Sequence, residues 1–195
     1  AAERMERKLA PRLAQASDVD VLHRNTATIV NQVAALKHLV DEFRDYARLP
    51  ATRTEPLELN GLVRELMLLY AGNEHGVRVE ARLDPDLPPI LGDASQLRQV
   101  IHNLIKNAKE ALEQQADGRI VVATQAMRAR QGERPTAVRL VVRDNGPGFP
   151  EKLLGRVFEP YVTSKAKGTG LGLAIVRKII EEHGAQIEIA NKVTG

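Results

Sequence analysis

FEPYVTSKAKGTGLGLAIV, residues 158–176, contains three glycines at alternate positions, 168, 170 and 172, directly before an apolar segment. The apolar spacing predicts a helix from about Leu171 to His183, with Gly184 as a typical helix terminator. The glycines place bare backbone amides ahead of the helix N-terminus, where the helix dipole favours an anion. Because each glycine costs chain entropy when it is ordered, a purely structural loop has little use for three of them. The stretch therefore predicts a phosphate-binding loop.

Lys165 and Lys167 lie just before these glycines and add positive charge to the predicted anion site. Two common nucleotide-binding loops do not fit the stretch. The G-x-x-x-x-G-K-[ST] pattern is absent, and a G-x-G-x-x-G fingerprint should follow a strand and end in glycine, where this sequence has Leu173. The loop therefore belongs to another class of nucleotide site.

The segment from 94 to 115 predicts a second helix, capped by Asp93. Its buried face consists of Leu97, Val100, Ile101, Leu104, Ile105, Ala108 and Leu112. Asn103 and Asn107 lie one turn apart beside that face, although asparagine is a poor helix former. A cap or a buried polar contact would explain one asparagine, whereas a pair in phase favours a ligand. Mg²⁺ bound to a nucleotide is a suitable one, because it takes few protein oxygens.

Residues 143–149, RDNGPGF, follow a predicted strand. Asp-Asn-Gly is a strong turn former, so the motif alone is equally consistent with a simple turn. In a nucleotide site, Asp144 could accept a hydrogen bond from an exocyclic amine such as adenine N6. Gly146 and Gly148 would then let the backbone bend close to the base.

The rest of this half alternates irregularly between helices and strands. We expect a helix over 61–70 capped by Asn60, strands over 77–83, 119–127 and 137–144, and a strand near 186–190. This order predicts an α/β sandwich with helices on one face of a mixed sheet.

The first 49 residues differ from the rest. A heptad seam runs from Asp18 to Leu49, and a further helix is expected over 3–16, ended or kinked at Pro11. The seam consists of Leu22, Ile29, Leu36 and Phe43, with Val19, Thr26, Val33, Val40 and Ala47 at the alternate positions. The linker-like ATRTEP after Pro50 sets a domain boundary, giving a helical hairpin over 1–49 and an α/β domain over 50–195. A strict seven-residue repeat favours a homodimer through residues 18–49.

Composition excludes other classes. The net charge is only +3 with both signs interleaved, and there is no Trp, so we expect no nucleic acid partner. The absence of Cys excludes disulfides and thiolate metal sites and fits a reducing cytosol. No apolar run approaches the roughly 20 residues that cross a bilayer, so we expect a soluble segment.

Taken together, NLIKNAKEAL, DNGPG, FEPYVTSK and GTGLGLAIV resemble the N, G1, F and G2 boxes of the histidine-kinase catalytic domain. That domain has the Bergerat fold of the superfamily shared with gyrase, Hsp90 and MutL, and the resemblance covers roughly residues 56 to 195. VDEFRDYARLP, residues 40–50, is similar to the second dimerisation helix of NtrY-type kinases, which are associated with nitrogen regulation.

The resemblance implies ATP and Mg²⁺ as cofactors. It implies that residues 1–49 are part of a dimerisation and histidine-phosphotransfer region and that residues 50–195 are the catalytic ATP-binding domain. It implies Asn107 as the magnesium ligand, with Asn103 near the phosphates and Asp144 reading adenine. The implied nucleotide contacts are Asn103, Lys106, Asn107, Asp144, Gly146, Gly148, Tyr161, Thr163, Ser164, Lys165, Gly168, Thr169, Gly170, Leu171, Gly172 and Leu173. It also implies an NtrX-like response regulator as partner and a cytoplasmic place within an inner-membrane protein.

The phosphoacceptor of the family lies in an H-[ED]-x-x-[NH]-P context, which none of the histidines has. These are His23, His38, His75, His102 and His183. We therefore expect the acceptor to lie outside this chain and the chain alone to be unable to phosphorylate itself. The glycine-containing closing strand that the family has after the last helix is also expected to be missing.

Two other functions remain open at this point. One is an ATPase of the gyrase or MutL type that uses ATP to gate dimerisation, although such proteins usually carry a water-activating glutamate at the position of Asn103. The other is a dimerisation and docking module whose nucleotide site has decayed.

Overall fold

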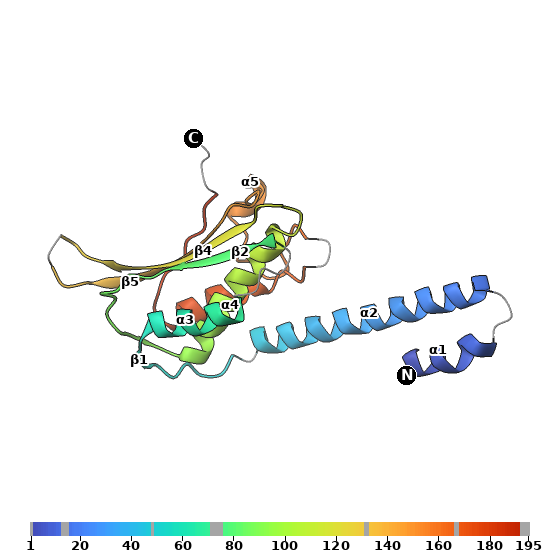
Figure 1. Cartoon of the computed structure of the whole chain (residues 1–195). Helices are drawn as coiled ribbons and strands as arrows, with labels where there is room; N and C mark the ends of the chain where they lie inside the picture. The colour runs from blue at the N-terminus through green and yellow to red at the C-terminus, as the bar shows by residue number, and fades with distance from the viewer. Residues whose placement is uncertain are drawn as a thin grey trace. The chain divides into compact units, whose positions relative to one another are not determined.

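The computed structural model of the chain describes residues 2–12, 16–47, 49–70, 76–130, 133–165 and 168–191. The chain divides into two compact units, Ala1–Leu49 and Pro50–Gly195 (Figure 1). Lys167 and His75 lie outside the described residues, as does the side chain of His38. The assignment of the first unit to dimerisation stays a prediction.

The first unit is helical. Helix α1 covers Ala2–Leu9, a 3₁₀ turn η1 covers Ala10–Arg12, and α2 covers Ala16–Ala47. Pro11 lies in the 3₁₀ turn, which confirms that it ends the first helix. Among the seam residues, Thr26 is buried, whereas Ile29, Val33, Leu36, Val40 and Phe43 are all at least half exposed. The described helices contain no segment that is long and apolar enough to cross a membrane.

The second unit is built on a mixed sheet. Strands β2 (Arg78–Arg82), β4 (Arg119–Met127) and β5 (Ala137–Asp144) lie in the order β2-β4-β5, with β2 parallel and β5 antiparallel to β4. A short antiparallel pair, β1 (Glu55–Leu57) and β3 (Ile90–Gly92), was not expected from the sequence, because three residues are too few to show an alternating pattern.

Helices α3 (Leu59–Leu69), α4 (Ala94–Ala111) and α6 (Gly172–Glu182) lie on one side of this sheet, and a single turn, α5 (Glu151–Leu154), precedes the glycine-rich stretch (Figure 1). The apolar faces of α3 and α4 form the core with Ile120 and Val122 of β4. Every predicted core residue of α4 is buried except Leu104, which is half-buried. The α/β sandwich with helices on one face of a mixed sheet is confirmed.

Asn60 does not cap a helix, and that prediction is wrong. Helix α3 begins two residues earlier than expected, with Glu58 at the cap position, and Asn60 is 4% exposed. Its amide donates to the Asp84 carbonyl at 2.7 Å and accepts from the Thr124 hydroxyl at 2.7 Å. Thr124 is the third inward-facing side chain of β4, so Asn60 satisfies a polar group that the core would otherwise leave unpaired.

The strand expected near 186–190 is not formed. Residues 185–191 have no strand pairing within the described part of the chain. An alternating sequence forms a strand only when a neighbouring strand accepts and donates its backbone hydrogen bonds, and none of the described strands does so here.

Asp93 fixes the start of α4, as predicted. Its Oδ1 accepts from the backbone N–H groups of Ser95 at 3.0 Å and Gln96 at 3.1 Å, and its Oδ2 accepts from Arg53 N–H at 3.1 Å. The Asp93 N–H in turn donates to His183 Nε2 at 3.0 Å, at the end of α6. The hydrogen bond from the Ser95 hydroxyl is the main cause that lowers the pKa of Asp93 to about 2, and the N–H groups of Gln96, Arg53 and Ser95 also lower it.

We expect Asp93→Ala to lower the free energy of unfolding by about 1 kcal/mol, the usual cost of losing an N-cap acceptor. The folded-state pKa of about 2 lies below the ordinary aspartate value, so the charged carboxylate stabilises the fold above about pH 4. That contribution should disappear as the pH falls from about 4 to 2. Urea unfolding of the wild type and Asp93→Asn across this range measures it. Asp117→Asn, at an exposed aspartate, is the control, and equal pH profiles for all three proteins would contradict the prediction.

Candidate nucleotide site

The three predicted motifs meet on one side of helix α4. A Cβ atom at Gly172, where α6 begins, would lie 3.8 Å from Asn107 Nδ2. A Cβ atom at Gly146, in the Asp-Asn-Gly loop, would lie 3.5 Å from the Cβ of Ala111. The Lys165 ammonium contacts both Asn107 and Glu110. Segments far apart in the sequence therefore converge on residues 107–111.

The glycine-rich loop is built around a close crossing of two backbones. Gly170 has a φ of 71°, and Tyr161, with a φ of 65°, donates its N–H to the Gly170 carbonyl at 3.1 Å. A Cβ atom at Gly170 would lie 2.6 Å from the carbonyl carbon of Tyr161, so only glycine fits. Leu171 is fully buried and anchors the loop to the start of α6.

Helix α6 begins without a side-chain cap. Leu171 occupies the cap position and makes no side-chain hydrogen bond to the first turn. The first N–H groups of a helix have no partner within the helix, so an anion is well placed to accept from them. Gly168 and Thr169 lie before this end, and Gly172 and Leu173 form its first residues. Phosphate binding by this loop stays a prediction.

Hydrogen bonds hold the Asp-Asn-Gly loop on both sides. Asn145 accepts from Arg119 N–H at 2.7 Å and donates to the Asp117 carbonyl at 2.9 Å. Gly148 has a φ of 74° and packs against Asn191, whose amide bonds both the N–H and the carbonyl of Phe149. Sequence reasoning missed Asn145 and Asn191, because side-chain to backbone pairing between distant segments leaves no local pattern.

Asp144 lies at the end of β5 with its side chain exposed. Its Oδ1 accepts from Gly146 N–H at 2.9 Å, which orients the carboxylate and fixes the turn. The carboxylate can still accept further hydrogen bonds, as an adenine amine would require. The role of Asp144 as a base reader stays a prediction.

Asn107 already faces a cation. Its Oδ1 lies 3.3 Å from Lys165 Nζ, which also lies 2.5 Å from Glu110 Oε2. The described residues hold no group of three or more His, Cys, Asp or Glu side chains that could cage a metal on their own. A cation that takes one or two protein oxygens and completes its shell with phosphates and water, as Mg²⁺ does, fits this donor set.

The remaining predicted contacts lie on the same elements. Asn103 and Lys106 are half-buried on α4, Tyr161 and Ser164 are exposed in the loop, and the Thr163 hydroxyl accepts from Lys165 N–H at 3.1 Å. Nothing in the fold tests their contact with a nucleotide, so these roles stay predictions.

The described histidine side chains all have structural partners. His23 contacts Glu6, and His183 accepts from Asp93 N–H while it pairs with the Ile179 carbonyl. His102 Nδ1 lies 2.7 Å from the Tyr70 hydroxyl, and burial, with Lys106 as a second cause, lowers the pKa of His102.

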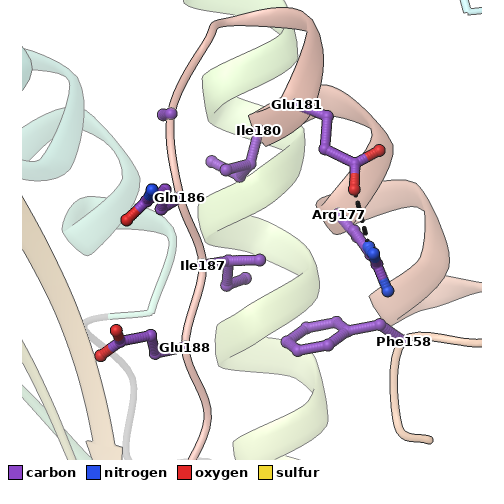
Figure 2. Close-up of a pocket in the computed structure, with 8 residues that line it drawn as sticks. Phe158, Arg177, Ile180, Glu181, Gln186, Ile187 and Glu188 are labelled. Carbon is purple, nitrogen blue, oxygen red and sulfur yellow. Dashed lines mark hydrogen bonds and ion pairs between the residues drawn. The ribbon is translucent and has the colours of Figure 1, made fainter.

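A pocket of about 470 Å³ lies between Phe158, α6 and residues 185–188. Figure 2 shows Ile180, Ile187 and Phe158 projecting into it, with the Arg177–Glu181 ion pair at its rim. None of the predicted nucleotide contacts lines this pocket.

Comparison with known proteins identifies the family. Residues 92–195 match the histidine kinase-, DNA gyrase B-, and HSP90-like ATPase family. The nitrogen regulation protein NtrY of Azorhizobium caulinodans is 35% identical over 100% of this chain and 24% of its own length. The sensory histidine kinase/phosphatase NtrB of Rhizobium leguminosarum bv. phaseoli is 32% identical over 92% of this chain and 49% of its own length.

Solved structures agree. The histidine kinase ThkA in complex with the response regulator protein TrrA superposes with a TM-score of 0.68 at 26% identity, over 94% of this chain and 50% of that chain. The full-length kinase ShkA in complex with AMPPNP has a TM-score of 0.61 at 30% identity, over 92% of this chain and 37% of that chain.

The chain spans about a quarter of NtrY and half of NtrB. The match nevertheless covers both the asparagine helix and the glycine-rich loop. The chain therefore belongs to the histidine kinase-, DNA gyrase B-, and HSP90-like ATPase family, and within it to the sensor histidine kinases related to NtrY.

Proposed function

We propose that this kinase domain binds Mg²⁺ and ATP on the face of α4 that carries Asn107, and transfers the γ-phosphoryl group to a histidine outside this chain. The observation that carries the proposal is the convergence of the three motifs on residues 107–111. A nucleotide needs a base reader, a cation site and an anion site within its own length, and the three motifs would supply one each.

Positioning and charge neutralisation would supply most of the catalysis, as is usual in phosphoryl transfer. The amides at the start of α6 and the Lys165 ammonium would hold phosphate oxygens. Mg²⁺ held by Asn107 would neutralise charge that develops on the phosphates. The Asp144 carboxylate would fix the other end of the ATP through the adenine amine.

Asn103 favours phosphoryl transfer over ATP hydrolysis. Asn103 carries an amide, and an amide cannot take a proton from water as a carboxylate can. ATP bound there would persist until an acceptor histidine reaches it.

The partners follow from the relatives. ThkA is described in complex with a response regulator, and the NtrY relative is a nitrogen regulation protein. We propose a response regulator of the NtrX kind as the final phosphoryl acceptor, and a cytoplasmic location, where ATP is available, as part of a longer inner-membrane protein.

We expect the chain to form a homodimer through residues 18–49, because the exposed seam of α2 is apolar along its length. Leu36→Glu should shift the chain to a monomer in light scattering or sedimentation, since it places charge in the middle of the seam. Lys37→Glu, on the neighbouring exposed position, is the control. A monomeric wild type at high concentration would contradict the expectation.

Asp144→Ala should abolish ATP binding, and Asp144→Asn should weaken it by about 10- to 100-fold, the range of a hydrogen bond to a charged group. Asn can keep the turn bond to Gly146 but offers adenine a weaker acceptor. Calorimetry with ATP and with GTP measures both affinity and base selectivity. Unchanged ATP affinity in Asp144→Asn, or no preference for ATP over GTP in the wild type, would remove Asp144 as the base reader.

Incubation of the chain with γ-labelled ATP should leave it unlabelled under conditions that preserve phosphohistidine. The physical reason is that no histidine of this sequence has the acceptor context, and His23 instead contacts Glu6. Acid-labile label at His23 or His38, removed by His23→Ala or His38→Ala, would show that the acceptor lies within the chain.

A further inference from the structure

Glu110 contacts Lys165 beside Asn107, and sequence patterns did not suggest this contact. It lies three residues after Asn107 on α4, so both side chains project from the same face of the helix. Lys165 Nζ lies 2.5 Å from Glu110 Oε2 and 3.3 Å from Asn107 Oδ1. Both members of the ion pair are about two-thirds shielded from solvent, with 37% and 33% of their side chains exposed.

The Lys165 ammonium therefore lies between two oxygen atoms that accept its hydrogen bonds. Such an arrangement favours a cation of any kind, because an amide oxygen and a carboxylate both present negative charge to it. If Asn107 Oδ1 binds Mg²⁺, an ammonium on the same oxygen is a like charge within a few ångströms, and the two cations repel strongly. Lys165 and Mg²⁺ cannot both keep this contact.

We propose that Glu110 is a positioning residue of the nucleotide site: it holds Lys165 on Asn107 in the free protein and faces the Mg²⁺ that accompanies the nucleotide. This inference rests on the proposed function. Lys165 leaves Glu110 when the nucleotide binds and turns to the phosphates, and its departure leaves a carboxylate that needs the metal as its counter-charge. The pair makes nucleotide binding depend on the metal.

The two side chains have opposite effects on that dependence. Without the Glu110 charge, the triphosphate meets no fixed anion, so binding in the absence of metal strengthens and the metal gains less. Without the Lys165 charge, Glu110 repels the triphosphate unless the metal is present, so binding becomes more dependent on it.

The test is the ratio of ATP dissociation constants in EDTA and in saturating Mg²⁺, measured by calorimetry on the whole chain. Glu110→Gln should lower this ratio by about tenfold, the low end of the range for a hydrogen bond to a charged group. Lys165→Met should raise it. The double variant Glu110→Gln with Lys165→Met should not equal the product of the single effects, because the two side chains act on each other.

Glu113→Gln and Lys152→Met, both at exposed positions, are the matched controls and should keep the wild-type ratio. Thermal unfolding of each variant checks that it is folded. An unchanged ratio in Glu110→Gln, with ATP still bound, would overturn the inference and leave the proposed function standing. A wild type that binds no ATP would overturn both.

Discussion

Helix α4 buries one apolar face against α3 and strand β4, and the rest of the catalytic unit depends on this contact. Ile101, Ile105 and Leu112 are fully buried, and each contributes roughly 1.5–3 kcal/mol of apolar burial. Because side chains three and four residues apart share a helix face, this burial fixes the rotation of α4 about its axis. Asn107 and Glu110 must then face the loops. The core residues thus orient the site residues on this helix.

Strand register and apolar burial position the Asp-Asn-Gly loop and the glycine-rich loop. Strand register places Asp144 opposite Ile120, at the end of β5 that lies next to the C-terminal part of α4. The buried Leu171 sets the start of α6, which packs against α4. Hydrogen bonds then fix the shape of each loop. Asn145 and Asn191 hold the Asp-Asn-Gly loop, and the bond from Tyr161 N–H to the Gly170 carbonyl holds the glycine-rich loop.

The sequence predicted elements whose signal is local. The long periodic run of α4, its Asp93 cap and the glycines before α6 were all visible, because each depends on neighbours within a few residues. Asn60 was misread because its partners, Asp84 and Thr124, are distant in the chain. The expected strand at 186–190 failed because a strand needs a partner that its own sequence does not supply. Glu110 was missed because its role depends on where Lys165 lies.

The site combines parts of unequal rigidity. Asp144 and Asn107 project from a strand end and a helix whose backbones are held by the core, so the proposed base reader and the proposed metal ligand would be preorganised. Lys165 comes from a loop, and its ammonium is held by an ion pair with Glu110 and a hydrogen bond to Asn107, both on α4. In the proposed site, recognition of the base would therefore require little rearrangement, whereas phosphate binding by Lys165 would require its ion pair to open. A difference of this kind favours a domain that holds its nucleotide while the phosphate end remains adjustable to an incoming acceptor.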